Sequence, residues 1–161
     1  MRSVTPGLGK LVFSSPTAFL AFGFGSGLSP FAPGTMGTLV AVPFVFVLKS
    51  QGAVGFWIVL TLLFLLGIKI CGHLSHTLGV HDHPGIVWDE MVGYWLAVAF
   101  VPMQWHWLLA GFVLFRCFDI FKPWPICQFD KNVSGGLGIM LDDIIAALFT
   151  LIVLATAQLL W

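Results

Sequence analysis

Apolar runs separated by short polar stretches make up most of this chain. The longest run, 53–71 (AVGFWIVLTLLFLLGIKIC), is long enough to cross a bilayer, which takes about 20 apolar residues. A second run, 144–161, predicts another spanning helix, and a shorter run covers 38–48. Polar stretches at 72–90 and 116–143 lie between these runs. We therefore expect helices joined by polar connections.

Apolar residues 88–101 and 105–118 are divided by Pro102, and this pattern allows two topologies. A single helix kinked at the proline would place Asp89 and Asp119 on opposite faces of a membrane. A hairpin would place them on the same face. Each arm of the hairpin would rise roughly 18–20 Å at 1.5 Å per residue, so the two acids would reach matching heights.

The distribution of basic residues favours the hairpin. Only Lys49 falls on the side opposite to the polar stretches, and Arg2 and Lys10 join the majority if the N-terminus lies with them. Because basic residues are enriched in cytoplasmic loops, the polar stretches are predicted to face the cytoplasm. The basic residues that border these stretches are Lys69, Arg116, Lys122 and Lys131.

The amino-acid composition indicates which class of protein this pattern belongs to. Of 161 residues, 58% are hydrophobic and 9% are charged, and the mean hydropathy is +0.99. Soluble domains carry about 25% charged residues, so lipid must form part of the solvent here. We predict one domain over 1–161, an all-α integral membrane helical bundle with short spanning helices and a polar site at the cytoplasmic face. A net charge of zero argues against nucleic acid as a partner.

The stretch 116–143 concentrates the scarce charges. It holds four of the seven acidic residues (Asp119, Asp130, Asp142 and Asp143) and the basic residues Arg116, Lys122 and Lys131. In the hairpin topology, Asp119, Asp142 and Asp143 converge with Asp89 and Glu90 at one membrane face. Three simpler interpretations stay open: a solvated loop, ion pairs between helix ends, and acids in the first turn of the last helix, stabilised by its dipole.

Five carboxylates close together would repel one another and raise one another's pKa. A divalent cation removes this conflict, and oxygen ligands without cysteine favour Mg²⁺ over zinc. Such a metal can polarise a phosphoryl oxygen and activate a water. Arg116 and Lys122 lie three residues on either side of Asp119 and are suited to binding phosphate oxygens. The pattern therefore indicates metal-assisted phosphoryl chemistry on a phospholipid.

A glycine-rich segment, GFGSGLSPFAPGTMGT (23–38), precedes the first apolar run. Ser29, Thr35 or Thr38 can cap the helix that follows, and a helix start favours an anion. A tight re-entrant turn without a ligand explains the same composition. The segment is not a GxxxxGK[ST] phosphate loop, because no lysine follows it.

Phosphatase signatures built on a covalent nucleophile are missing from the sequence. No cysteine is followed by arginine six residues later, and no DxDx[TV] motif occurs. A metal-activated water is therefore the favoured nucleophile, although an aspartyl phosphoenzyme stays open. The pair His81 and His83 around Asp82 is more simply explained by hydrogen-bonded structural histidines than by a metal site.

Four segments of the chain resemble one family, phosphatidylglycerophosphatase A. They are GFGSGLSPFAPGTMGT, GVHDHPGIVWDEMVGYW, GFVLFRCFDIFKPWPI and FDKNVSGGLGIMLDD, and they follow in the order of that family from Gly23 to the final helix. The resemblance implies Mg²⁺-dependent hydrolysis of phosphatidylglycerophosphate to phosphatidylglycerol in the bacterial inner membrane. The positions that it carries over are Asp82, Asp89, Glu90, Arg116, Asp119, Lys122, Asp130, Gly135, Gly136, Gly138, Asp142 and Asp143.

The roles that we assign to these positions are hypotheses. The expected metal ligands and catalytic residues are Asp89, Glu90, Asp119, Asp142 and Asp143, and Asp119 is either a further ligand or the base that orients the water. The expected substrate-binding residues are Arg116, Lys122, Asp82, Thr35 and Thr38. Two alternatives remain: a small cation transporter or channel using intramembrane acids, and a phosphatase of another lipid monophosphate such as phosphatidic acid. The sequence leaves the oligomeric state open.

Overall fold

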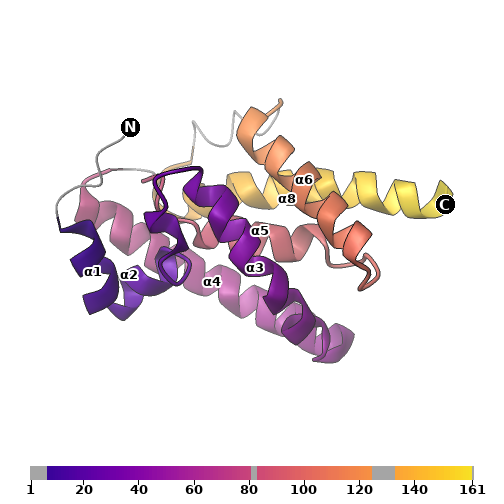
Figure 1. The fold of residues 1–161 in the computed structure, drawn as a ribbon, viewed down its shortest axis with the longest axis horizontal. Helices are drawn as coiled ribbons and strands as arrows, with labels where there is room; N and C mark the ends of the chain where they lie inside the picture. The colour runs from indigo at the N-terminus through magenta and orange to yellow at the C-terminus, as the bar shows by residue number, and fades with distance from the viewer. Residues whose placement is uncertain (1–6, 81–82, 125–132, 161) are drawn as a thin grey trace.

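The computed structural model describes residues 7–80, 83–124 and 133–160, and these residues form only helices and connecting loops (Figure 1). The all-α prediction is therefore confirmed for the described residues. The helices are α1 (Leu8–Ser14), α2 (Pro16–Ala21), the 3-10 helix η1 (Ser26–Leu28), α3 (Pro33–Lys49), α4 (Gly52–Leu78), α5 (Trp88–Ala97), α6 (Trp105–Phe121) and α8 (Gly135–Leu160).

Helices α4 and α8 are the two described helices that are long and apolar enough to cross a membrane. Large side chains on both point outward, for example Leu62 at 60% exposure on α4 and Ile152 at 61% on α8. Exposed apolar surface on this scale marks contact with lipid or with another protein. Both helices also extend further than the apolar runs predicted, because α4 continues through residues 72–78 of the polar stretch.

The start of α8 corrects one interpretation of the sequence. The helix begins at Gly135, not at Ile144, and its first turn contains no acidic residue. Asp142 and Asp143 therefore lie about two turns into the helix, beyond the reach of the dipole effect. Stabilisation by the helix start does not explain why two buried carboxylates stand there.

The hairpin topology is confirmed by α5 and α6, which pack against each other on either side of a turn over 98–104. Helix α5 is shorter than expected and ends at Ala97. At the turn, the Nζ of Lys49 donates a hydrogen bond to the carbonyl of Val101 at 2.5 Å. Because α5 contacts α3, α4, α6 and α8, and nine of its ten residues are buried, it forms the centre of the bundle.

Helices α4 and α8 cross where their glycines meet. A Cβ atom on Gly136 would lie 1.9 Å from the carbonyl oxygen of Ile68 and 2.8 Å from the backbone nitrogen of Gly72. Such contacts are possible only without side chains, as at the close helix crossings of membrane proteins. Figure 1 shows the two helices leaving this crossing in different directions. The end of α4 near Gly72 is thereby held against the beginning of α8.

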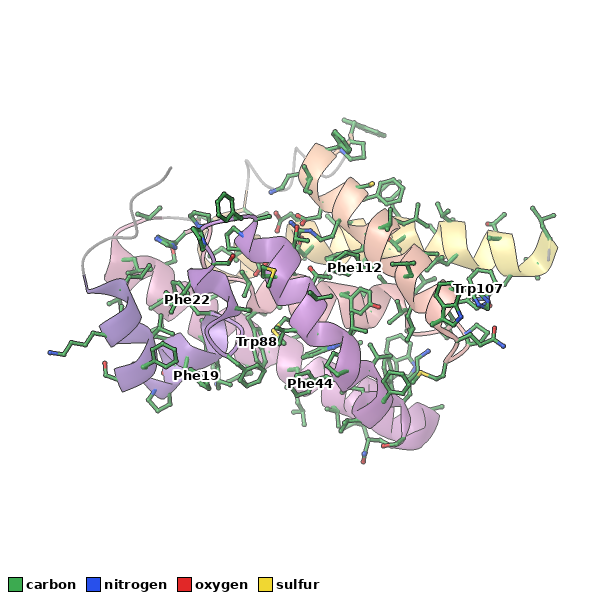
Figure 2. All side chains as sticks on the ribbon, viewed as in Figure 1. Phe19, Phe22, Phe44, Trp88, Trp107 and Phe112 are labelled. Atoms are coloured by element: carbon green, nitrogen blue, oxygen red, sulfur yellow. The ribbon has the colours of Figure 1, made fainter. Side chains whose placement is uncertain are left out.

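Aromatic side chains hold α3 and the glycine-rich segment against α5. Phe24 stacks on Phe44 with ring centroids 5.5 Å apart, and Phe44 meets Trp95 edge to face at 6.2 Å. Figure 2 shows Phe44 and Trp88 in this part of the bundle. The indole nitrogen of Trp95 also donates to the carbonyl of Ala41 at 2.9 Å. These contacts fix where α3 begins relative to the start of α5.

Candidate functional site

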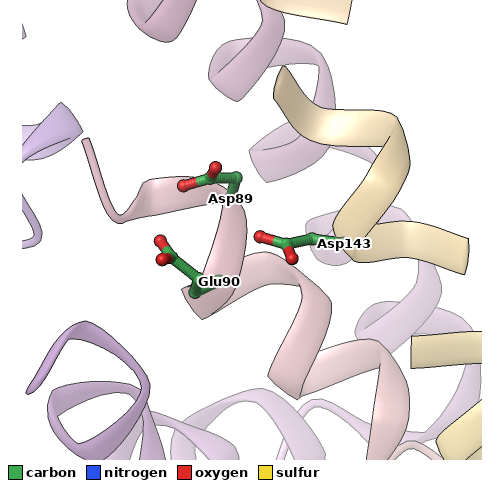
Figure 3. Close-up of side chains that lie close together, drawn as sticks. All are labelled: Asp89, Glu90 and Asp143. Carbon is green, nitrogen blue, oxygen red and sulfur yellow. The ribbon is translucent and has the colours of Figure 1, made fainter. Parts of the chain in front are cut away.

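Three carboxylates from two helices converge beside the α4–α8 crossing. Asp89 and Glu90 occupy the first turn of α5, and Asp143 extends toward them from α8 (Figure 3). One oxygen atom from each lies within 4.8 Å of the other two. Asp89 is 7% exposed and Asp143 is 2% exposed. We call these three residues the carboxylate triad.

Local structure explains how the triad assembles. The first turn of α5 favours Asp89 and Glu90, because the helix dipole attracts negative charge there. One turn later, Gly93 lets α8 approach closely: a Cβ atom there would lie 3.2 Å from the Cβ of Asp143 and 2.8 Å from the ring of Phe115. The absence of a side chain at this position therefore brings Asp143 to the beginning of α5.

Each member of the triad has a buried oxygen atom without a hydrogen-bond partner among the described residues: Asp89 Oδ1, Glu90 Oε2 and Asp143 Oδ1. A buried carboxylate oxygen atom without a partner costs roughly 1–3 kcal/mol, and a bound cation would remove this cost. Hard oxygen donors of this kind suit Mg²⁺ better than zinc. The residues present therefore fit the expected metal.

Burial changes the acidity of the two α5 acids, which lie outside both candidate spans. Burial raises the pKa of Asp89 well above its usual range, and the neighbouring charges of Glu90 and Asp143 raise it further. Burial likewise raises the pKa of Glu90, to about 7. A cation that binds the carboxylate forms must therefore compete with protons, and its affinity is expected to rise with pH in this range.

Arg116 of α6 lies beside the triad. Its NH1 atom is 3.6 Å from Glu90 Oε1 and forms an ion pair with Asp119, one turn along α6. The Nε of Arg116 is buried and has no hydrogen-bond partner among the described residues. The Asp119 carboxylate also interacts with that of Asp143. Asp119 is thus positioned by an arginine at the edge of the triad.

Asp142 belongs to a different contact. Its Oδ2 atom accepts a hydrogen bond from Lys122 Nζ at 2.6 Å. Lys122 caps α6 in the left-handed conformation with φ 39°. The ion pair therefore ties the end of α6 to α8, next to the triad but separate from it.

Gly34 is a site residue that sequence reasoning did not single out. It is buried in the first turn of α3, and a Cβ atom there would lie 2.1 Å from Glu90 Oε1 and 3.0 Å from both terminal nitrogens of Arg116. The one feature of the sequence that could have pointed to Gly34 is its position directly after Pro33, at a predicted helix start. The glycine-rich segment thus reaches the site through backbone, as close approach requires.

The two threonines expected to bind substrate differ in environment. Thr38 is fully buried, and its hydroxyl donates to the carbonyl of Gly34 at 2.9 Å, within its own helix. Thr35 is partly buried in the first turn of α3, directly after Gly34. Asp82 and Asp130, which the sequence also indicated, lie outside the described residues.

Comparison with known proteins agrees with the resemblance found in the sequence. A family model described as Phosphatidylglycerophosphatase A matches residues 19–158. Phosphatidylglycerophosphatase A of Escherichia coli (strain K12) is 46% identical over 142 residues, which cover 88% of this chain and 83% of the relative. The Haemophilus influenzae protein of the same name is 45% identical over 153 residues, which cover 94% of each chain.

A third relative carries a different name. A Bacteroides thetaiotaomicron protein with the provisional name phosphatidylinositol-3-phosphatase is 40% identical over 144 residues, which cover 84% of this chain and 89% of the relative. No solved structure matches the chain. The family model and the first two relatives cover most of the chain at high identity, and the resemblance is confirmed: the chain belongs to the phosphatidylglycerophosphatase A family.

Proposed function

We propose that this protein hydrolyses phosphatidylglycerophosphate to phosphatidylglycerol and inorganic phosphate. The family supplies the activity, since two relatives at 45–46% identity are named for it. The structural observation that carries the proposal is the carboxylate triad, with three buried oxygen atoms that have no partner in the described part of the chain, beside Arg116. This arrangement combines a place for a hard cation with a donor for phosphate.

In this proposal Asp89, Glu90 and Asp143 hold Mg²⁺. The ion, when bound, polarises the phosphoryl group and makes a water more acidic. Arg116 donates its Nε, which has no partner among the described residues, to a phosphate oxygen and keeps Asp119 in place through their ion pair. Asp119 is the group best placed to orient the attacking water, because it lies at the edge of the triad without belonging to it.

Two further elements complete the proposed pocket. The backbone N–H groups at the start of α3, near Gly34 and Thr35, can receive the phosphate, because the first N–H groups of a helix have no partner within it. Lys122 holds Asp142 in this structure and would contribute positive charge at the same edge. Asp142 remains a candidate ligand, which would require its ion pair with Lys122 to open.

We also propose that the protein crosses the bacterial inner membrane several times with this site at the cytoplasmic face. Helices α4 and α8 have the required length and apolarity. The basic residues near the site, set against Lys49 at the far end of α3, follow the bias of cytoplasmic loops.

The test is release of inorganic phosphate from phosphatidylglycerophosphate by purified protein, with Mg²⁺ and with a chelator. Asp89→Asn and Asp143→Asn each remove a charge but keep the side-chain shape. We expect both to lower kcat/KM on the order of 10³-fold or more, the loss typical of a group that acts on the reacting atoms. Chelation should abolish the activity, and added Mg²⁺ should restore it.

Asp119→Asn serves as the comparison for a residue at the edge of the triad, and Thr156→Ala on the exposed part of α8 serves as the neutral control. Thermal unfolding in detergent checks that every variant folds. Wild-type activity in both triad variants would reject the site, and full activity in the presence of chelator would reject the metal.

The name of the third relative makes substrate choice a separate question. Phosphatidic acid and phosphatidylinositol 3-phosphate carry the same monoester group on different head groups, so a panel of these lipids measures selectivity directly. The transporter alternative is less well supported, because the described acids gather at one place and do not follow a path along the helices.

A further inference from the structure

An apolar groove opens between the two candidate spanning helices. It has a cavity volume of about 180 Å³ and is open to the outside, because Trp57 and Thr61 on its wall are exposed. Val92, fully buried on α5, lines it from the inside. The lining residues are Trp57, Leu60, Thr61 and Phe64 of α4, Val92 of α5 and Ile144 of α8.

The groove begins next to the carboxylate triad. Ile144 directly follows Asp143, and Val92 lies three residues after Asp89, on the same side of α5. These residues lie roughly 1.5–4.5 Å further along their helices than the carboxylates. Along α4, the groove runs over 57–64, roughly 10 Å of helix, in the direction away from the crossing at Gly72. It therefore leads from the site toward the middle of the candidate spans.

The size of the groove limits what can occupy it. Its volume is roughly six times the share of one water molecule in the liquid. A helix of another chain, about 10–12 Å across, would occupy several times this volume over the same length, so it cannot fit inside the groove. The wall is apolar except for Thr61, whose hydroxyl already donates to the carbonyl of Trp57 at 2.8 Å. A segment of one hydrocarbon chain fits these dimensions and this chemistry.

We infer that the groove binds an acyl chain of the lipid substrate and so aligns its phosphate with the carboxylate triad. This inference rests on the proposed function, because it requires a phosphorylated lipid at the triad. A chain that moves from bilayer to groove leaves one apolar environment for another and gains no hydrophobic free energy. The groove therefore aligns the phosphate of the lipid with the triad and adds little to the affinity of the protein for the lipid.

The test fills the groove and compares two substrates. Thr61→Trp places an indole in the groove, while Thr156→Trp makes the same change at an exposed threonine of α8 whose hydroxyl is bonded in the same way, to the carbonyl four residues earlier. Phosphate release is measured with a long-chain phosphatidylglycerophosphate in mixed micelles and with a dihexanoyl analogue below its micelle concentration.

We expect Thr61→Trp to lower kcat/KM for the long-chain lipid on the order of tenfold and to leave the short-chain substrate unchanged, because misplacing a reacting group is enough to cost this much. Thr156→Trp should match wild type with both. Equal long-chain activity in the two variants would overturn the inference. If wild-type protein released phosphate from neither substrate, the proposed function itself would fail.

A second measurement does not depend on activity. A phosphatidylglycerophosphate with a photoactivatable group in the middle of one acyl chain is cross-linked to the protein, and the labelled peptides are mapped. Label on residues 57–64 that is lost in Thr61→Trp but kept in Thr156→Trp supports the groove. Label spread evenly over the exposed faces of α4 and α8 would mean bulk lipid contact only, and would reject the inference.

Discussion

Glu90 shows how tightly single residues control this site. Its side chain lies between the backbone of Gly34 on α3 and the guanidinium of Arg116 on α6, while the carboxylate belongs to the triad. Three helices therefore meet at one side chain, and on the side of Gly34 the space is too small for a methyl group. A change that adds one carbon atom here moves the catalytic groups without altering any charge.

Gly34→Ala is expected to reduce kcat strongly, by about 10²-fold, while the protein stays folded. The added Cβ would meet Glu90 Oε1 at 2.1 Å, and a displacement on the order of 1 Å in an active site costs this much. The matched control is Gly9→Ala: Gly9 is also the second residue of a helix, but a Cβ there meets nothing within 4 Å.

Both substitutions improve helix propensity by up to about 1 kcal/mol, so a loss of kcat in Gly34→Ala alone would point to the contact with Glu90. Steady-state kinetics and thermal unfolding of the two variants provide the comparison. If Gly34→Ala retained wild-type kcat, the position of Glu90 against α3 would be irrelevant to catalysis.

At the scale of elements, the crossing of α4 and α8 positions Asp143. Gly136 and Gly72 allow the two backbones to touch, and Met140 packs against Gly67 one turn further on. The contact is steric and local, so it determines the separation of the helices near the site. Further from the crossing, α5 packs between the two helices and leaves the apolar groove open on one side.

Gly136→Ala should therefore destabilise the protein. The new Cβ would lie 1.9 Å from a backbone oxygen of α4, which cannot move aside as a side chain can. We expect a loss of about 1–3 kcal/mol in the free energy of unfolding, as for other overpacked sites, together with reduced activity. Denaturation in detergent measures the first, with Gly9→Ala as reference. An unchanged unfolding midpoint would contradict the close backbone contact between α4 and α8 at Gly136.

For the whole molecule, the orientation of α4 decides where the site lies. The helix has 27 residues and is therefore roughly 40 Å long, longer than the hydrocarbon core of a bilayer at about 30 Å. Ser50 lies two residues before α4 begins and Thr77 lies in its last turn; both are exposed hydroxyl residues, and Thr77 is the one nearer the triad. They form a matched pair for a topology experiment.

Ser50→Cys and Thr77→Cys are made in a chain whose cysteines are replaced by alanine. A membrane-impermeant maleimide should label the first only from the periplasmic side of intact spheroplasts and the second only in inside-out vesicles. This result follows from a single crossing by α4 with the site at the cytoplasmic face. Labelling of both residues from one side would rule out that crossing, and reversed labelling would place the site in the periplasm.

Much of the site could be predicted from the pattern of charges. Acids at the borders of apolar runs indicated Asp89, Glu90 and Asp143. The hairpin argument predicted Asp89 and Asp119 at one height, and their neighbours Glu90 and Arg116 lie 3.6 Å apart in the structure. Which acid belongs to the triad and which forms an ion pair could not be predicted, because this depends on how each helix is rotated about its axis. Asp142 and Asp143 are neighbours in sequence, yet the first faces Lys122 and the second faces the triad.

The sequence by itself determined the helical class, the strongly apolar composition and the family, because hydropathy, periodicity and extended motifs are properties of the chain alone. The tertiary structure decided which oxygen atoms share one space and what stands next to them. Gly34 and the start of α8 at Gly135 illustrate the reason. A glycine makes its close contacts through the backbone, so its residue type does not reveal which side chain it meets. The direction of a side chain depends on how helices from distant parts of the chain pack together.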